Sequence, residues 1–144
     1  MAKTSDSIHV ELSPEDTFAA ASDLARFDEW LVLHDGWRRE VPTELAVGTE
    51  ATSVVKAKGT RVRFDWKIDT YDPPRRVRFS GSGKGGVKAK IDLTVEPDGD
   101  GSEVTFLIDL GGLPLMGPVG KAAAKAVHGD IHKSLERFKA TFVQ

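Results

Sequence analysis

Apolar and polar residues alternate near the start of the chain, where Ile8, Val10 and Leu12 are separated by polar neighbours. A period of two is typical of a strand with one buried face. Six later segments have β-type patterns, and turns rich in glycine, proline and aspartate separate them. We therefore expect strands over residues 7–12, 37–41, 49–56, 61–71, 75–80, 87–96 and 103–110. Their short connections predict antiparallel neighbours, because a parallel crossover needs a longer segment.

Two short helices are expected between the first two strands. Ser13 and Pro14 are typical of a helix start, with Ser13 as N-cap and Pro14 in the first turn, and this helix should run to Ser22. Asp23 is expected to cap the second helix. The apolar face of that helix has helical spacing and contains Leu24, Phe27, Trp30 and Leu31.

A long helix is predicted from near Pro118 to the end of the chain at Gln144. From Val119, apolar residues recur at three- and four-residue spacing, namely Ala123, Val127, Ile131, Leu135, Phe138 and Phe142. Only this segment is long enough to cover the concave face of a continuous sheet. The prediction is an α+β fold in which a curved antiparallel sheet of about seven strands wraps around the C-terminal helix and leaves an apolar cavity between them.

Strand parity and helix phase select the side chains that should face this cavity. The ligand-binding candidates are Trp30, Phe64, Trp66, Phe79, Phe106, Met116, Val119, Ala123, Val127 and Asp130. Core packing would account for any one of them as well, since cores are large and pockets are few. Trp66 is the leading candidate because a buried indole N–H needs a hydrogen-bond acceptor, and a ligand oxygen would supply one.

Composition narrows the class of protein. The chain has 144 residues, of which 40% are hydrophobic, and this fits one globular domain spanning residues 1–144. The absence of cysteine excludes disulfides, thiolate nucleophiles and cysteine-bound zinc. The first six residues do not lead into an apolar segment, and no apolar run is long enough to span a bilayer. We therefore expect a cytoplasmic protein.

The chain shows no convincing catalytic or metal-binding pattern. His128 and His132 have the spacing of two metal ligands on one helix, but no third ligand is near, which favours exposed surface histidines. His34 and Asp35 are adjacent in a predicted loop, where neighbouring side chains point in different directions. Residues 81–88 lack the Gly-Lys-Ser/Thr ending of a phosphate loop and are expected to form a flexible hairpin. We expect no catalytic residue, no metal and no cofactor.

Charge is distributed unevenly, although the net charge is only −2. Residues 56–90 hold eleven Lys or Arg and three Asp, whereas residues 1–55 hold four basic and eleven acidic residues. Parity places the basic side chains of three strands on the outer face of the sheet: Arg61, Arg63, Lys67, Arg76, Arg78, Lys88 and Lys90. Asp65, Asp69 and Asp92 interleave with them, which favours a solvated, partly neutralised exterior over contact with nucleic acid or an anionic membrane. We expect no DNA binding, and binding of RNA or of a protein partner has only this basic segment in its support.

Several of these segments resemble the SRPBCC superfamily of polyketide cyclases, START-type lipid-transfer domains and pollen-allergen-like proteins, which share the helix-grip fold. The resemblance covers essentially the whole chain and rests on Ser13-Pro14-Glu15, on residues 22–31, on the turn at residues 71–76 and on the closing helix. Residues 22–38, 81–88 and 110–120 are similar to an actinobacterial branch, some members of which carry the name of toxins of toxin–antitoxin pairs.

The resemblance implies a cavity under the C-terminal helix that receives a lipid, a polyketide or another hydrophobic molecule. Noncatalytic binding or transport of such a ligand is the first interpretation, because the inward residues are almost wholly apolar. A polyketide cyclase or aromatase is an alternative, with Asp130, His34 or Trp66 as polar groups in the pocket. A toxin of a type II toxin–antitoxin system is the second alternative. Fold-level likeness alone does not decide among the three.

Overall fold

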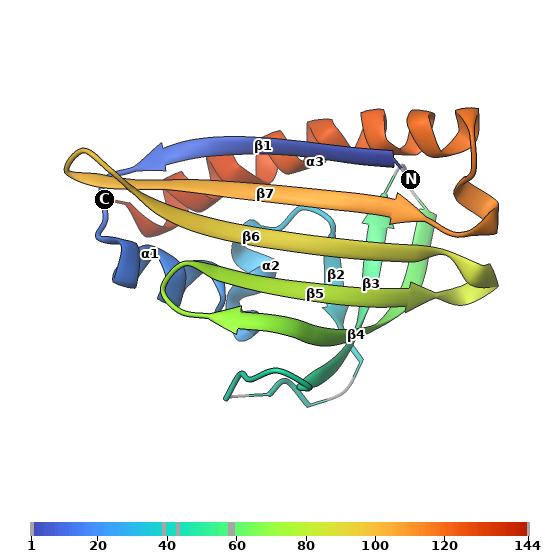
Figure 1. Cartoon of the computed structure of the whole chain (residues 1–144), viewed down its shortest axis with the longest axis horizontal. Coiled ribbons are helices and arrows are strands. Elements are labelled where there is room, and N and C mark those ends of the chain that lie inside the picture. Colours follow the sequence, from blue (N-terminus) through green and yellow to red (C-terminus); the bar gives the residue numbers. More distant parts are fainter. Residues whose placement is uncertain (1, 39, 43, 58–59, 144) are drawn as a thin grey trace.

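The structure is a computed structural model that describes residues 2–38, 40–42, 44–57 and 60–143. Within these residues, seven strands form one antiparallel sheet in the order β1-β7-β6-β5-β4-β3-β2, as the alternation predicted (Figure 1). The strands are β1 (Ala2–Val10), β2 (His34–Trp37), β3 (Glu50–Ala57), β4 (Thr60–Asp72), β5 (Arg76–Gly83), β6 (Lys88–Asp98) and β7 (Gly101–Gly111). The helices are α1 (Pro14–Ala21), α2 (Phe27–Trp30) and α3 (Pro118–Phe142), with 3₁₀ turns η1 (Leu24–Arg26), η2 (Lys84–Gly86) and η3 (Leu113–Leu115).

The helix starts follow the predicted capping only in part. The Ser13 hydroxyl accepts a hydrogen bond from the backbone N–H of Asp16 at 3.1 Å, and Pro14 occupies the first turn of α1. Pro118 likewise begins α3. The cap predicted at Asp23 is wrong, because its side chain makes no capping bond and the segment starts as the 3₁₀ turn η1. The helix expected to reach Gln144 ends at Phe142, and Gln144 lies outside the described residues.

Two strands differ from their predicted bounds. β1 starts at Ala2, five residues before the predicted start, because it pairs with β7 along its whole length, from Ala2 opposite Leu110 to Val10 opposite Ser102. The strand predicted over residues 37–41 is instead β2 at His34–Trp37. The turn after α2 brings His34 opposite Val55 of β3, so pairing begins earlier in the chain. Residue 39 of the predicted strand lies outside the described residues.

Helix α3 lies along β1 and β7 on the concave side of the sheet (Figure 1). Its apolar stripe is buried from Val127 to Phe138, with Ile131, Leu135 and Phe138 at 1% exposure or less. The ring of Phe138 meets Trp30 of α2 edge to face, with centroids 5.1 Å apart. Helix and sheet therefore share one apolar core, which lies toward the C-terminal half of α3.

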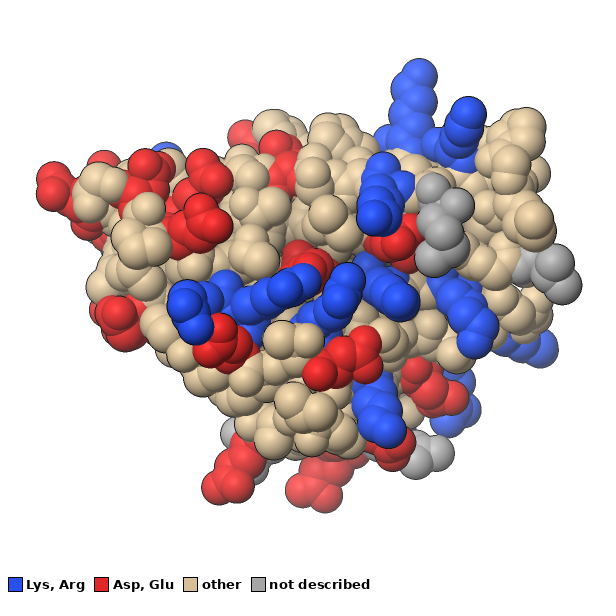
Figure 2. Space-filling model, in the orientation of Figure 1, with Lys and Arg blue, Asp and Glu red and all other residues tan. Residues whose placement is uncertain are grey.

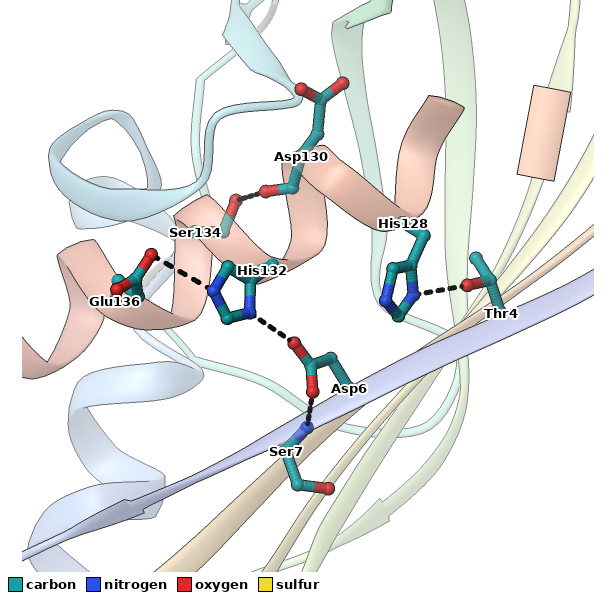
Figure 3. A network of polar contacts seen from close by, with 8 residues as sticks. All are labelled: Thr4, Asp6, Ser7, His128, Asp130, His132, Ser134 and Glu136. Carbon is teal, nitrogen blue, oxygen red and sulfur yellow. Dashed lines mark hydrogen bonds and ion pairs between the residues drawn. The ribbon is translucent and has the colours of Figure 1, made fainter. Parts of the chain in front are cut away.

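Two histidines of α3 hold β1, and Figure 3 shows these contacts. His128 Nδ1 and Thr4 Oγ1 share a hydrogen bond of 2.8 Å, and His132 Nδ1 lies 2.8 Å from Asp6 Oδ2. The side chains are exposed, as the sequence predicted, but they have partners on the neighbouring strand. Among the described residues, no group of three or more His, Asp or Glu could hold a metal ion. Their spacing serves the contact between α3 and β1.

The pair of His132 and Asp6 makes stability depend on pH. The hydrogen bond with Asp6, and then the nearby Glu136 carboxylate, raise the pKa of His132 above its ordinary value. Burial alone would raise the pKa of Asp6, but the hydrogen bonds from His132 and from the Ser7 backbone lower it overall. The stabilisation by His132 is therefore fully present below its unfolded pKa of about 6.5 and is lost as pH rises through the folded pKa. The contribution of Asp6 is lost only at low pH, as its carboxylate becomes protonated.

We expect His132→Asn to flatten the dependence of unfolding free energy on pH in the interval that begins near the ordinary histidine pKa of about 6.5 and extends above it. Urea denaturation at a series of pH values measures this dependence. Asp6→Asn should flatten the same interval, and the double variant should add little, because both changes remove one interaction. An unchanged pH profile in His132→Asn would contradict this role.

Candidate ligand-binding cavity

A cavity of about 340 Å³ lies between the concave face of the sheet and α3. Strands β2 to β7 contribute its walls, α2 closes one side, and Ala123, Ala126 and Val127 of α3 cover it. This volume is at the lower end of the range typical of small-molecule sites. Apart from His34 and Ser53, the lining side chains are apolar or indole rings, and no acidic or basic residue other than His34 is among them.

Seven of the predicted candidates line this cavity. They come from three strands and two helices and are Trp30, Phe64, Trp66, Phe79, Phe106, Ala123 and Val127. Period-two alternation in β4, β5 and β7 brought the four strand residues to one face, and helical phase brought the two residues of α3 over them. The structure shows that these seven residues surround one space. Their contact with a ligand stays a prediction.

The other three candidates do not line the cavity. Met116 and Val119 are 64% and 58% exposed, because the connection after β7 and the first turn of α3 carry them out into solvent. Asp130 is half-buried on the flank of α3, and Figure 3 shows its carboxylate on the side of the helix away from His132. A role for Asp130 as a base acting within the cavity has no support from this position.

Trp66 is held in place by protein groups. Its Nε1–H donates to Ser53 Oγ at 2.8 Å, and both side chains are buried. Phe64 stacks on the indole with centroids 5.0 Å apart. Gly81 of β5 lies beneath the ring, where a Cβ would come within 2.4 Å of it. The hypothesis that a ligand oxygen satisfies this N–H is therefore wrong, because Ser53 already accepts it.

Sequence reasoning missed Ser53 as a lining residue. Ala51, Ser53 and Val55 line the cavity from β3, but small and polar side chains at these positions hide the alternation that marks an inward face. The signal that could have found Ser53 is its register, since it lies opposite Phe64 across the β3–β4 pair. Its hydroxyl accepts from Trp66 and retains a hydrogen to donate.

His34 lines the cavity from β2 and does not lie in a loop as predicted. Its ring packs against Phe27 edge to face and against Trp37, with centroids 6.0 and 4.7 Å away. Burial lowers the pKa of His34, although Asp28 and Asp35 act in the opposite direction. The imidazole is therefore neutral near pH 7, with one donor and one acceptor nitrogen.

The adjacent Asp35 does not act with His34. Its carboxylate points to β4, where Arg61 Nε lies 2.7 Å from Asp35 Oδ2. An imidazole without an orienting carboxylate lacks the arrangement of a catalytic triad. The prediction that neighbouring side chains diverge here is thus correct, while His34 and Ser53 form a small polar part of an otherwise apolar wall.

The glycine-rich residues 81–88 make the hairpin between β5 and β6, and they do not form a phosphate loop. Gly85 and Gly86 have φ of 84° and 90°, which side chains other than glycine rarely adopt. A Cβ on Gly112 would come within 2.1 Å of the Gly86 carbonyl oxygen, so the two turns touch. The hairpin therefore borders the cavity at the end where η2 and η3 meet.

The basic outer face of the sheet is partly neutralised, as its interleaved aspartates suggested. Arg76 makes two charge-assisted hydrogen bonds to Asp92, and Arg78 Nε lies 3.9 Å from the same carboxylate. Asp65 accepts a hydrogen bond from the Thr52 hydroxyl at 2.9 Å. Figure 2 shows acidic groups between the basic ones on this face.

A curved antiparallel sheet closed by one long helix, with an apolar cavity between them, places the protein in the α+β class of helix-covered half-barrels. The chain belongs to the family described as polyketide cyclase / dehydrase and lipid transport, whose model matches residues 1–143. This confirms the SRPBCC resemblance inferred from sequence.

Relatives and solved structures agree with this family. The chain is 46% identical over 138 residues to Uncharacterized protein Rv1546 of Mycobacterium tuberculosis, covering 96% of each chain. It is 44% identical over 142 residues to Toxin Rv0910 of the same organism, covering 99% of each. The crystal structure of protein CV1439 from Chromobacterium violaceum has a TM-score of 0.74 at 16% identity, covering 100% of this chain and 99% of that one. This last likeness supports the fold alone.

No helix within the described part of the chain is both long and apolar enough to cross a membrane.

Proposed function

We propose that the protein binds a small, uncharged hydrophobic molecule in the cavity and does not convert it chemically. The observation that carries the proposal is the cavity itself, about 340 Å³ in volume, whose lining offers neither a carboxylate nor a permanently cationic group. Burying an ionised group against such a wall costs several kcal/mol, so the ligand must be neutral where it is buried. His34 and the Ser53 hydroxyl can each donate one hydrogen bond, which suits a carbonyl or hydroxyl oxygen on an otherwise apolar ligand.

A matched pair of fluorescent dyes tests whether the cavity binds a hydrophobic molecule and whether it prefers a neutral one. N-phenylnaphthylamine is neutral, and anilinonaphthalene sulfonate has the same rings with an added anionic group. We expect the neutral dye to bind with at least about tenfold higher affinity, because the cavity contains no cation to pair with the sulfonate. Equal affinities, or no saturable binding of the neutral dye, would count against a neutral apolar site.

Native mass spectrometry identifies the natural ligand. Protein purified gently from cells should carry an adduct that organic extraction removes, and the extracted compound should be neutral and hydrophobic. The cyclase or aromatase alternative predicts turnover of a polyketide chain. Two of its three polar candidates are weakened here, since the indole N–H of Trp66 is bonded to Ser53 and Asp130 lies outside the cavity; the third, His34, lines the cavity.

The toxin alternative is favoured by one specific observation, the name of the relative that is 44% identical. If it applies to this chain, expression should arrest growth. Arrest that depends on the cavity would link toxicity to a captured ligand. Arrest relieved by reversing Arg76 and Arg78 would point instead to a macromolecule on the outer face.

A further inference from the structure

Two glycines of β5 lie opposite two aromatic residues of β4. Gly81 pairs with Trp66, and Gly83 pairs with Phe64, across the antiparallel register. Phe79, two residues before Gly81, places a large side chain on the same inner face of β5. The inner face of β5 therefore loses its side chains at the two positions that meet the rings of β4.

The indole of Trp66 lies with its face on the backbone of β5. A Cβ on Gly81 would be 2.4, 2.5 and 2.9 Å from Cε3, Cζ3 and Cδ2, which are three consecutive atoms of one ring. If the edge of the ring pointed at β5, the third atom would lie clearly farther away. Neither Gly81 nor Gly83 has a positive φ, so the ring, and not the backbone conformation, requires the missing side chain.

Phe64 and Trp66 form what we call the aromatic platform. Their ring planes are only 17° apart, with centroids separated by 5.0 Å, and a Cβ on Gly83 would be 3.0 Å from Cζ of Phe64. The bond from the indole N–H to Ser53 Oγ, 2.8 Å long, fixes the orientation of Trp66. Aromatic rings that cover a glycine on the next strand stabilise a sheet. Here the same rings also line the cavity, so a flat surface is present before a ligand enters.

The rest of the cavity wall is also rich in aromatic rings. All three tryptophans of the chain and four of its seven phenylalanines line it, namely Trp30, Trp37, Trp66, Phe27, Phe64, Phe79 and Phe106. Offset-stacked and edge-to-face ring pairs are favourable beyond the area that they bury. A flat ring compound can form such pairs, whereas an aliphatic chain has no ring face and loses rotational freedom when it is confined.

We propose that Gly81 and Gly83 make the cavity select a flat, neutral ring compound over a flexible aliphatic chain of similar size. The two glycines allow the aromatic platform to lie flat on β5, and the ring of the ligand packs against this platform. A side chain at position 81 would lift the indole into the space that the ligand needs. This inference rests on the proposed ligand binding and adds to it the shape of the ligand.

Three neutral alcohols with the same number of carbon atoms test this selection. Naphthol is flat and aromatic, decahydronaphthol has the same fused rings in saturated form, and decanol is a flexible chain. Displacement of N-phenylnaphthylamine measures the affinity of each. Burial of hydrocarbon alone would favour the two saturated compounds, because they carry more apolar surface. We expect naphthol to bind at least about fivefold more tightly than either of them.

Two variants locate the selection on the platform. Gly81→Ala should weaken naphthol binding by at least about tenfold, because the added Cβ displaces the indole from β5. Trp66→Leu keeps an apolar side chain but removes the ring face, so the preference for naphthol should disappear while decanol still binds. The ratio of the affinities is the readout, since general damage to the fold would weaken all three alcohols alike. Trp66→Leu and the wild-type ratio decide the question if Gly81→Ala does not fold.

The chain offers a matched control for each variant. Gly129→Ala makes the same change on α3, at an exposed position where an added Cβ meets nothing within 4 Å. Trp37→Leu removes another indole of the lining, one whose N–H donates to the Leu24 carbonyl. Both controls should retain the preference for naphthol.

Three results would overturn selection by the platform. They are binding of decanol or decahydronaphthol as tight as that of naphthol, an unchanged naphthol affinity in folded Gly81→Ala, or a preference that survives Trp66→Leu and is lost in Trp37→Leu. Failure of the proposed function would look different, since then neither the dye nor any of the three alcohols would bind.

Discussion

Ala123→Phe is expected to lower the affinity for N-phenylnaphthylamine by at least about tenfold while leaving the protein folded. Ala123 lies on the second turn of α3, lines the cavity and is half-buried. A phenyl ring there would occupy space that a ligand needs. Because the ring enters an existing void and displaces no packed side chain, the unfolding free energy should change by less than about 1.5 kcal/mol.

Ala122→Phe is the matched control for this substitution. Ala122 is the preceding residue on the same helix, but it is exposed, so its ring would extend into solvent. Dye titration and urea denaturation of both variants separate blocked binding from damage to the fold. Wild-type affinity in Ala123→Phe would show that the dye binds somewhere other than the cavity.

Phe138→Ala should reduce the unfolding free energy by about 3–5 kcal/mol, the largest loss of stability expected from one substitution here. Phe138 has 0% exposure, and its ring contacts both Trp30 and Phe142, with centroids 5.1 and 4.9 Å away. Removing it leaves a void where α2, α3 and the sheet converge. Urea denaturation would measure the loss directly if the m-value of the variant is similar to that of the wild type.

Phe142→Ala provides the comparison. Its ring is half-exposed at the end of α3, where Arg26 lies 4.4 Å from the ring centroid. We expect this variant to lose less than about 2 kcal/mol, because part of the side chain already contacts water. Similar losses from the two substitutions would mean that the end of α3 is not anchored through Phe138.

The strands of the central sheet could be predicted from sequence because burial on one face imposes a period of two. This alternation is sufficient to assign Phe64, Trp66 and Phe79 to the inner face, where they line the cavity. The first half of β1 has no such pattern, since Lys3 to Ser7 are polar on both faces. Its position is determined by backbone pairing with β7 and by contacts from α3, and neither leaves a local hydrophobic signal.

The apolar residues of the cavity wall were largely predicted from sequence, but the polar residues His34 and Ser53 were not. His34 reaches the wall only because the chain leaves α2 at Trp30 and pairs with Val55, a contact between segments distant in sequence. The exposure of Met116 and Val119 was likewise not predictable from helix phase. Phase selects the face of α3, whereas the length of sheet beneath that face decides which residues are covered.

The placement of the two chain termini has a practical consequence. Ala2 lies beside Gly120, where a Cβ on the glycine would be 3.7 Å from the Ala2 Cβ, so this end of β1 lies next to the first turn of α3, one turn before Ala123 of the cavity lining. Residue 143 lies beyond the other end of α3, whose 25 residues span about 37 Å. A purification tag or fluorophore fused at the amino terminus would therefore lie close to the part of α3 that covers the cavity, whereas the same fusion at the carboxyl terminus would lie far from it.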